Sequence, residues 1–367
     1  MKTRFLILLF ALTMMTTASA DTPMKVRGVV YDVGLQFNKG FYSVDTFDVE
    51  RVRYDMGIIS NILHANAVRI EGESIGRLTA AARVAREYGL RVFFNPWLMG
   101  GDAINTPSYM ARAAKAAEQL RQEGMDIVFV AGCEYSVFCN GIFDGSSVME
   151  RVGSMVGLMQ SGDSVGMEAA MARLNATLAD ICKGVRARFK GLVTYASGTW
   201  EKVDWSLFDV VGVDYYRDAQ TEEAYREGLR AYGKYGKPVY VMEVGCCAYE
   251  GAAARGGGGF AILQGTTPDG QSIYEGGITP KRSETEQADY IRQQTRIINS
   301  AGVDGMFVYV FSFPCSPYRE DGLDSDMTAY GLVKHFPKGS ARSRMIPAWA
   351  PKEAFYAVAE SYMRLKE

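Results

Sequence analysis

The sequence predicts an α/β protein with the (β/α)8 TIM-barrel fold, built as a single domain. Eight short apolar runs alternate with longer amphipathic stretches after the first twenty residues. The runs are continuous and rich in Val, Ile, Phe and Tyr, as expected of parallel strands that are covered on both faces. The first run, 26–32, is not followed by a glycine fingerprint, which disfavours an open doubly wound sheet. About 330 residues in such an alternation fit a barrel with loop insertions.

The expected elements follow one another along the whole chain. Strands are expected at 26–32, 66–70, 92–95, 127–131, 192–195, 210–214, 239–243 and 305–311. Helices are expected at 47–63, 75–87, 110–122, 165–189, 221–235, 284–300 and 352–365. The intervals leave long loops after strands four, seven and eight, with insertions at 146–166 and 245–282. An acidic segment, 320–326, lacks the spacing of a calcium-binding loop and is expected to be a solvated loop.

The first twenty residues have the pattern of a secretory signal peptide. Lys2 and Arg4 form a positive start, 5–15 is apolar, and 18–20 is a small-residue cleavage site ending at Ala20. We therefore expect residues 21–367 to form the barrel domain of a secreted or periplasmic protein. The apolar run is shorter than the roughly 20 residues that span a bilayer, and no later segment is long and apolar enough to span one, so no membrane span is expected.

Composition excludes several classes of function. The 367 residues carry 40 Lys and Arg against 42 Asp and Glu, with no basic cluster, so a nucleic-acid partner is not expected. His64 and His335 are the two histidines, too few and too far apart for an imidazole metal site. We expect no metal and no cofactor, and carboxylates as the acid–base groups of any enzyme. Composition leaves the oligomeric state open.

Polar and aromatic residues cluster where the predicted strands end, which in this fold is where catalytic groups lie. Glu134 and Glu243 are the most informative, because each follows a very apolar strand, the fourth and the seventh. The candidate binding residues are Arg69, Asn95, Trp97, Cys133, Tyr216 and Phe311. Two carboxyl groups are the equipment of glycosidic bond cleavage, in which one is a protonated acid and the other is ionised. A separation of ~5–5.5 Å between them gives retention of configuration, and ~6.5–9.5 Å gives inversion.

The order of these residues resembles the clan A glycoside hydrolases, which are eightfold barrels. The resemblance implies that Glu134 is the acid/base after strand four and Glu243 the nucleophile after strand seven. It also implies that Arg69 orients the nucleophile, that Tyr216 donates a hydrogen bond to it, and that a carbohydrate is the substrate. Asn95 and Trp97 would then line the sugar subsites.

Two positions depart from the clan pattern. Cys133 precedes Glu134 where the clan has Asn, and Phe311-Ser312 stands where strand eight has Trp-Ser. The motifs Phe94-Asn95-Pro96-Trp97 and Ala131-Gly132-Cys133-Glu134 are similar to those of proteins often labelled abortive infection protein. Three hypotheses follow. The first is an exported retaining glycoside hydrolase acting on a β-linked oligo- or polysaccharide, the second a carbohydrate-binding barrel without activity, and the third a defence or interaction protein.

Overall fold

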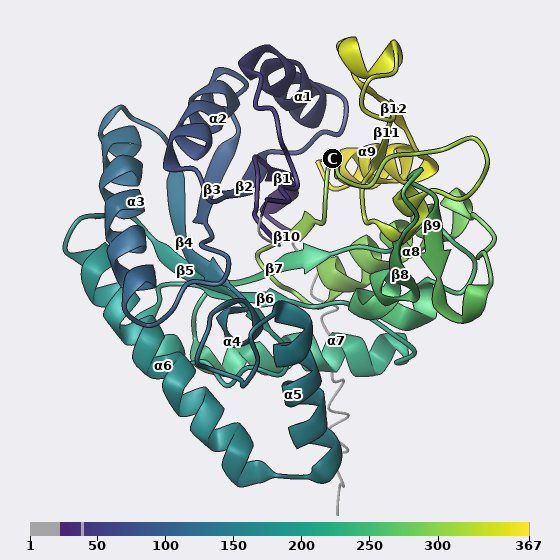
Figure 1. Cartoon of the computed structure of the whole chain (residues 1–367). Coiled ribbons are helices and arrows are strands. Elements are labelled where there is room, and N and C mark those ends of the chain that lie inside the picture. Colours follow the sequence, from purple (N-terminus) through teal and green to yellow (C-terminus); the bar gives the residue numbers. More distant parts are fainter. Residues whose placement is uncertain (1–22, 38–39, 367) are drawn as a thin grey trace, which may run out of the picture.

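Eight parallel strands close into a barrel in the computed structural model, which describes residues 23–37 and 40–366 (Figure 1). Each predicted strand is present, and their order around the barrel is β1-β10-β7-β6-β5-β4-β3-β2. The strands are β1 (Val26–Asp32), β2 (Ala67–Gly72), β3 (Arg91–Pro96), β4 (Ile127–Cys133), β5 (Val193–Gly198), β6 (Val211–Asp214), β7 (Val239–Val244) and β10 (Gly305–Val308). The fold class predicted from sequence is confirmed. The predicted signal peptide, 1–20, lies outside the described residues.

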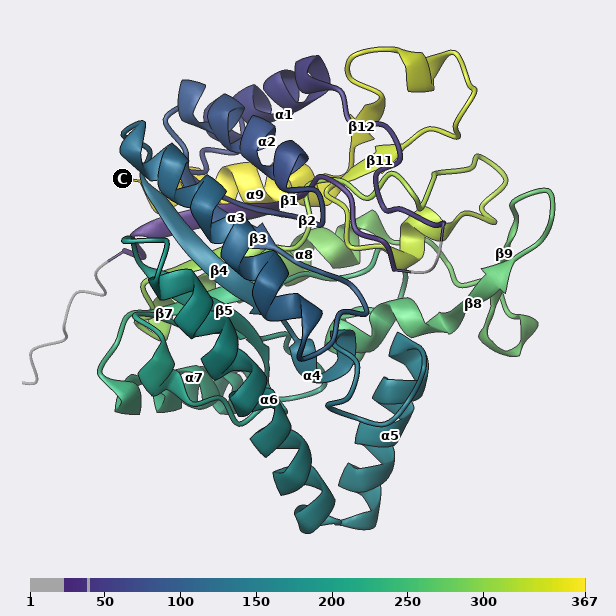
Figure 2. The same ribbon diagram turned by 60° about the vertical axis from the view of Figure 1, so that its left-hand side comes forward.

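Helices surround the barrel, as the side view shows (Figure 2). The α-helices are α1 (Val49–Asn61), α2 (Ile75–Glu87), α3 (Asn105–Gln122), α4 (Tyr135–Phe138), α5 (Val148–Ser161), α6 (Ser164–Arg186), α7 (Glu222–Arg230), α8 (Glu284–Ser300) and α9 (Glu353–Arg364). Ser74 and Ser283 cap α2 and α8 by accepting hydrogen bonds from backbone N–H groups of the first turn. A single 3-10 turn, Trp205–Leu207, takes the place of a helix between β5 and β6.

The lower half of the barrel is filled by aromatic side chains. The ring of Phe93 lies 4.6 Å from that of Phe307 and 5.5 Å from that of Tyr240, both edge-on. Gly28 makes room for this cluster, because a Cβ atom there would lie 2.2 Å from Cδ1 of Phe307. The barrel is therefore packed from its N-terminal end, and polar groups can gather only where the strands end.

The long loops predicted after strands four, seven and eight contain structure of their own. The insertion 146–166 includes α5, which Ser147 caps and Gly162 ends in the left-handed conformation at φ 68°. Figure 1 shows α5 and α6 as a hairpin that projects from the barrel. The loop after β7 carries the hairpin of β8 (Leu263–Thr266) and β9 (Ser272–Tyr274), and the loop after β10 carries β11 (Val333–His335) and β12 (Trp349–Pro351). Within the described ranges, no helix has the length and apolar character needed to cross a membrane.

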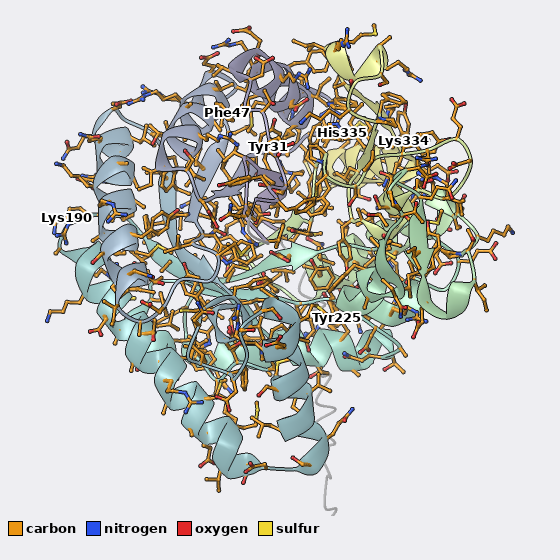
Figure 3. The ribbon with its side chains drawn as sticks, in the orientation of Figure 1. Tyr31, Phe47, Lys190, Tyr225, Lys334 and His335 are labelled. Atoms are coloured by element: carbon orange, nitrogen blue, oxygen red, sulfur yellow. The ribbon has the colours of Figure 1, made fainter. Side chains whose placement is uncertain are left out.

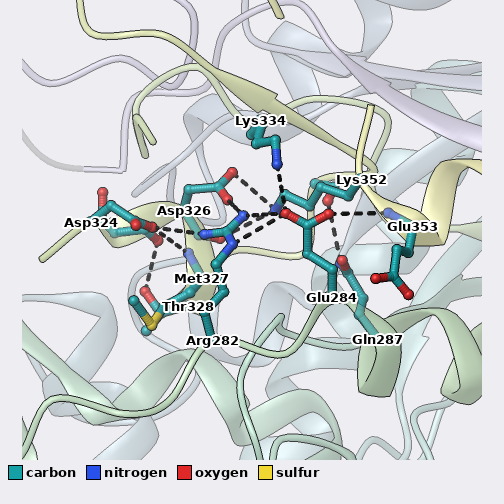
Figure 4. Close-up of polar contacts among 12 residues, drawn as sticks. Arg282, Glu284, Gln287, Asp324, Asp326, Met327, Thr328, Lys334, Lys352 and Glu353 are labelled. Atoms are coloured by element: carbon teal, nitrogen blue, oxygen red, sulfur yellow. Dashed lines mark hydrogen bonds and ion pairs between the residues drawn. The ribbon is translucent and has the colours of Figure 1, made fainter. Parts of the chain in front are cut away.

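The acidic segment after β10 is exposed at Glu320 and Asp321, as expected, but Asp324 and Asp326 belong to a buried ionic network, which corrects the expectation of a solvated loop for these two residues (Figure 4). Asp324 and Asp326 are almost fully buried. Arg282 reaches both, with Nη1 3.2 Å from Oδ1 of Asp324 and Nη2 2.7 Å from Oδ2 of Asp326. Lys352, with no exposed side-chain surface, places Nζ 2.9 Å from Oδ1 of Asp326. The network joins the loops after β7 and β10 to the start of α9, because its cations come from elements distant in the sequence.

A second buried carboxyl lies between the barrel and α1. Asp55 accepts hydrogen bonds from Oη of Tyr31 at 2.8 Å and from Nε1 of Trp349 at 2.9 Å. Burial raises the pKa of Asp55 to about 7. His335 pairs with Trp349 in the β11–β12 ribbon, and burial lowers its pKa to about 4, so the imidazole is neutral near pH 7. Figure 3 marks Tyr31 and His335 in this part of the molecule.

We expect Asp55 to make stability fall as pH rises. Its pKa rises on folding from 3.8 to about 7, so its stabilising contribution is complete below pH 3.8 and is lost as pH rises through about 7. Asp55→Asn keeps an acceptor for Trp349 and removes this dependence. Relative to wild type, the variant should gain about 4 kcal/mol of unfolding free energy between about pH 4 and pH 8, from about 1.4 kcal/mol per pKa unit. Urea unfolding across this range measures the difference. Parallel curves for both proteins, as expected for the exposed control Asp180→Asn, would contradict the assignment.

Candidate active site

Arg69 lies at the centre of a layer of polar side chains at the strand ends, which we call the polar layer. It follows the aromatic cluster of Phe93, Phe307 and Tyr240 along the barrel. Its side chain is fully buried, and Nη2 is 2.8 Å from Oε1 of Glu243 and 3.0 Å from Oε2 of Glu71. Nη1 donates to the carbonyl oxygen of Met242 at 2.9 Å, and Nε donates to Oδ1 of Asn95 at 2.8 Å. All three nitrogens of the guanidinium group thus have partners, and the group in turn holds the carboxylate of Glu243 in position.

Both carboxylate oxygens of Glu243 have a donor. Arg69 contacts Oε1, and Oη of Tyr216 donates to Oε2 at 2.9 Å. Glu243 is the penultimate residue of β7, with 7% of its surface exposed, and Tyr216 follows β6, so neighbouring strands bring them together. This environment is that of a positioned anion, because a cation and a neutral hydroxyl both stabilise negative charge on the carboxylate.

Cys133 is a free thiol at the end of β4. Its Sγ lies 3.4 Å from Oδ2 of Asp214 and 3.6 Å from Oε1 of Glu243. Burial, and then the charges of Asp214 and Glu243, raise the pKa of the thiol, so it stays protonated and acts as a weak hydrogen-bond donor. Asp214 ends β6, and its Oδ1 is 3.6 Å from Nη1 of Arg69. Sequence reasoning did not select Asp214, although it precedes Tyr215 and Tyr216 at a strand end.

The sulfur of Cys133 and carboxylate oxygens of Asp214 and Glu243 all lie within 4.8 Å of one another, a spacing that three metal ligands can have. Arg69 already provides the positive charge for the two carboxylates. A divalent ion placed there would be repelled by the guanidinium group. We therefore assign the cluster to Arg69 and not to a metal.

Glu134 differs from Glu243 in its backbone conformation and in the hydrogen-bond donors around its carboxyl group. It follows β4 in the left-handed conformation, at φ 42°, and its N–H donates to the carbonyl oxygen of Ala196 at 2.9 Å. No donor from the described part of the chain reaches its half-buried carboxyl group. Burial, followed by the charges of Asp214 and Glu243, raises the pKa of Glu134 well above the usual range. This carboxyl group is suited to hold a proton at neutral pH.

A further glutamate, Glu201, supports the turn that carries Glu134. Its Oε1 accepts hydrogen bonds from the N–H of Ser136 at 2.9 Å and from Oη of Tyr195 at 3.2 Å. Tyr195 accepts one from the N–H of Tyr135 at 2.6 Å. Sequence reasoning missed Glu201 because it lies beyond β5 in a turn, where no strand end marks it.

The other predicted binding residues differ in whether they lie in the polar layer. Asn95 is buried and bound to Arg69, so it acts on the guanidinium group. Trp97 is 3% exposed, with its ring 4.8 Å from that of Phe138 in an edge-on contact. Phe311 lies outside the polar layer, fully buried at ring distances of 6.0 Å from Tyr31 and 5.5 Å from Trp349.

Tyr309 takes the position that Phe311 was expected to hold. Because β10 ends at Val308, the first residue after the strand is Tyr309. Burial, then the charges of Glu71 and Glu243, raise the pKa of Tyr309. The apolar run 305–311 concealed this boundary, since it continues past the last ladder residue.

Comparisons with known proteins identify the fold. No protein-family model matches the chain, and no curated protein matches it. A solved GH113 β-1,4-mannanase is similar to it, with a TM-score of 0.57, 17% identity, and coverage of 93% of this chain and 99% of the other. The GH113 β-mannanase from Alicyclobacillus acidocaldarius gives a TM-score of 0.54, 16% identity, and coverage of 95% and 100%. The family 1 β-glucosidase from Thermotoga maritima gives 0.55, 12%, and 93% and 99%.

The chain therefore shares a (β/α)8 barrel fold with these glycoside hydrolases over nearly its whole length. At 12–17% identity the likeness establishes the fold alone, and an activity has to be argued from the residues at the strand ends. No comparison supports the resemblance to proteins labelled abortive infection protein.

Proposed function

We propose that the protein is an exported retaining glycoside hydrolase that cleaves a β-linked oligo- or polysaccharide. Glu134 is the general acid/base, and Glu243 is the nucleophile. The observation that carries the proposal is the contrast between the two carboxyl groups. Glu243 is held as an anion by Arg69 and Tyr216, whereas the pKa of Glu134 is raised by burial and neighbouring charges. Such a pair supplies the acid and the anion that glycoside cleavage requires. Export rests on the predicted signal peptide.

In the first step, Glu134 gives its proton to the glycosidic oxygen as the bond from that oxygen to C1 breaks. A carboxylate oxygen of Glu243 forms the new bond to C1, which yields a glycosyl ester and the free leaving group. Arg69 and Tyr216 keep the carboxylate in place during attack. Asn95 and Cys133 act behind them, the first on Arg69 and the second on Glu243.

In the second step, Glu134 is an anion and takes a proton from water as the water oxygen bonds to C1. The ester bond to Glu243 breaks, and the carboxylate is released. Two inversions at C1 leave the product with the configuration of the substrate. Trp97, Tyr216 and Tyr309 are the aromatic residues that we place around the sugar.

Proton NMR of a reacting aryl β-glycoside tests this mechanism. The β-anomer of the released sugar should appear first, before mutarotation produces the α-anomer. The α-anomer as first product would show inversion and would remove the role of Glu243 as nucleophile. A panel of aryl glycosides that differ in the sugar identifies an accepted substrate for the measurement.

Cys133 favours a second candidate, a barrel that binds carbohydrate without cleaving it. A thiol is a weak hydrogen-bond donor, and here it is directed at Asp214 and Glu243. Saturable binding of a glycan with no new reducing ends, at high protein concentration and long times, would support this candidate. Turnover that is lost in Glu243→Gln would exclude it.

A further inference from the structure

The backbone at Glu134 is strained, and the residues around it must hold the strain in place. Glu134 lies in the left-handed region, at φ 42° and ψ 45°, where a residue with a Cβ atom is disfavoured. Such a conformation persists only where the surrounding structure fixes it. The N–H groups of Tyr135 and Ser136 are the first two of α4, so the helix itself supplies no acceptor for them. The groups that accept their hydrogen bonds therefore decide whether the turn keeps its shape.

The acceptors are two buried side chains from β5 and the turn that follows it. The N–H of Tyr135 donates to Oη of Tyr195 at 2.6 Å, and the N–H of Ser136 donates to Oε1 of Glu201 at 2.9 Å. Oη of Tyr195 donates in turn to the same Oε1 at 3.2 Å. Oε2 of Glu201 accepts from the N–H of Gly198 at 3.2 Å. Both donors of the turn thus depend on Glu201, one directly and one through Tyr195.

The surroundings leave no substitute for these acceptors. Tyr135, Ser136 and Tyr195 have no exposed surface, so water does not reach the two N–H groups. The ring of Tyr135 lies directly against β4, because a Cβ atom at Gly132 would be 2.3 Å from it. Nε1 of Trp200, from the same turn as Glu201, donates to Oγ of Ser136 at 2.9 Å and adds a third link.

We propose that Glu201 is a positioning residue for general acid catalysis. Through Tyr195 and the N–H of Ser136 it holds the left-handed turn, and so keeps the carboxyl group of Glu134 directed at the leaving group. The inference rests on the proposed function and deepens it. None of these contacts reaches Glu243, which Arg69 and Tyr216 hold from β2 and the end of β6. Loss of Glu201 should therefore affect the step that needs an acid and spare the attack of the nucleophile.

Two substrates with the same sugar and different leaving groups test the proposal. Glu201→Ala should lower kcat/KM for an oligosaccharide at least about tenfold, and for the 4-nitrophenyl β-glycoside by less than about threefold, because 4-nitrophenolate needs little help from an acid. Glu201→Gln keeps one acceptor oxygen, so its loss should be intermediate. Equal losses on both substrates would show a merely structural role and would overturn the proposal.

A double-mutant cycle with Glu134→Gln gives a second measurement. Without an acid to position, Glu201→Ala should change kcat/KM for the oligosaccharide by less than about threefold, and fully additive losses would contradict the proposal. Asp209→Asn is the control. Asp209 lies at the other end of the connection between β5 and β6, where Oδ2 accepts from Nη1 of Arg186 at 2.6 Å and from the N–H of Val193 at 2.8 Å. This variant should lower stability and leave the ratio of the two kcat/KM values unchanged.

Tyr195→Phe keeps the decision open if Glu201→Ala does not fold. It removes only the hydroxyl link to Tyr135 and should lower the same ratio about threefold or more. Amide hydrogen exchange, followed by NMR, does not depend on turnover. Exchange at Tyr135 should be at least about tenfold faster in this variant than in wild type, and unchanged exchange would overturn the proposal. A wild-type protein that hydrolyses neither substrate would contradict the proposed function, whereas the exchange rates judge the hold on the turn separately.

Discussion

Glu243→Gln should lower kcat/KM for an accepted aryl β-glycoside by at least about 10³-fold, because the amide cannot form the glycosyl ester. The side chain keeps its shape, and Arg69 and Tyr216 retain an acceptor oxygen. Unfolding free energy should therefore stay within about 1–2 kcal/mol of wild type. Turnover by this variant at wild-type rate would remove Glu243 from the mechanism.

Glu134→Gln should show a loss that depends on the leaving group. A 4-nitrophenolate leaves without much help from an acid, whereas a sugar hydroxyl needs the proton that Glu134 supplies. We expect a loss of about 10²–10⁴-fold on an oligosaccharide and a smaller loss in glycosyl-ester formation on the activated substrate. Equal losses on both would contradict the role of acid. Glu168→Gln, exposed on α6, is the matched control and should not change either rate.

The raised pKa of Glu134 sets the pH dependence of the same reaction. Activity on an oligosaccharide requires the protonated form, so it should persist above the usual range of a carboxyl group and fall once Glu134 ionises. In Glu134→Gln the alkaline fall should disappear from the residual activity. An unchanged alkaline limb in the variant would assign that limb to another group.

Lys352→Met should destabilise the fold by about 3–5 kcal/mol, because it leaves the buried carboxylate of Asp326 without this cation. The Lys352 side chain is fully buried, and Nζ lies 2.9 Å from Oδ1 of Asp326 (Figure 4). Arg282 remains bound to the other oxygen, but it is shared with Asp324 and Glu284. Urea unfolding at neutral pH measures the change.

A lysine pair at the surface supplies the control. Lys338 and Asp45 lie 3.0 Å apart, with 85% and 56% of their side chains exposed. Lys338→Met should change stability by less than about 1 kcal/mol. Asp326→Asn combined with Lys352→Met removes both charges of the buried pair and should recover part of the loss. Similar small effects of the buried and the exposed lysine variants would show that the network does not hold the loops.

The sequence was sufficient to predict the barrel because its strands are covered on both faces and appear as uninterrupted apolar runs. The sequence was also sufficient to predict that one end of the barrel holds Glu134, Glu243, Arg69 and Tyr216, because parallel strands end at the same face. The structure places these four in one polar layer, and their roles in catalysis stay proposals.

Other features depend on pairing that a single sequence does not display. The end of β10 at Val308 is set by its ladder with β1, so the apolar run alone favoured Phe311 over Tyr309. Asp324 and Asp326 of the acidic segment are buried because Arg282 and Lys352 reach them from elsewhere in the chain. Glu201 acts through Ser136, a contact between residues 65 positions apart.

The aromatic cluster of Phe93, Phe307 and Tyr240 packs the N-terminal end of the barrel, whereas the polar site residues lie at the opposite end. The strands are held together from below, by a part of the molecule that no substrate reaches. The insertion 146–166, which lies outside both this aromatic cluster and the buried ionic network, can accordingly be exchanged or lengthened without disturbing the packing that keeps the barrel closed. For protein design, the N-terminal end of the barrel can therefore be kept unchanged. The insertion that contains α5 is the natural place for a different segment that binds a new ligand.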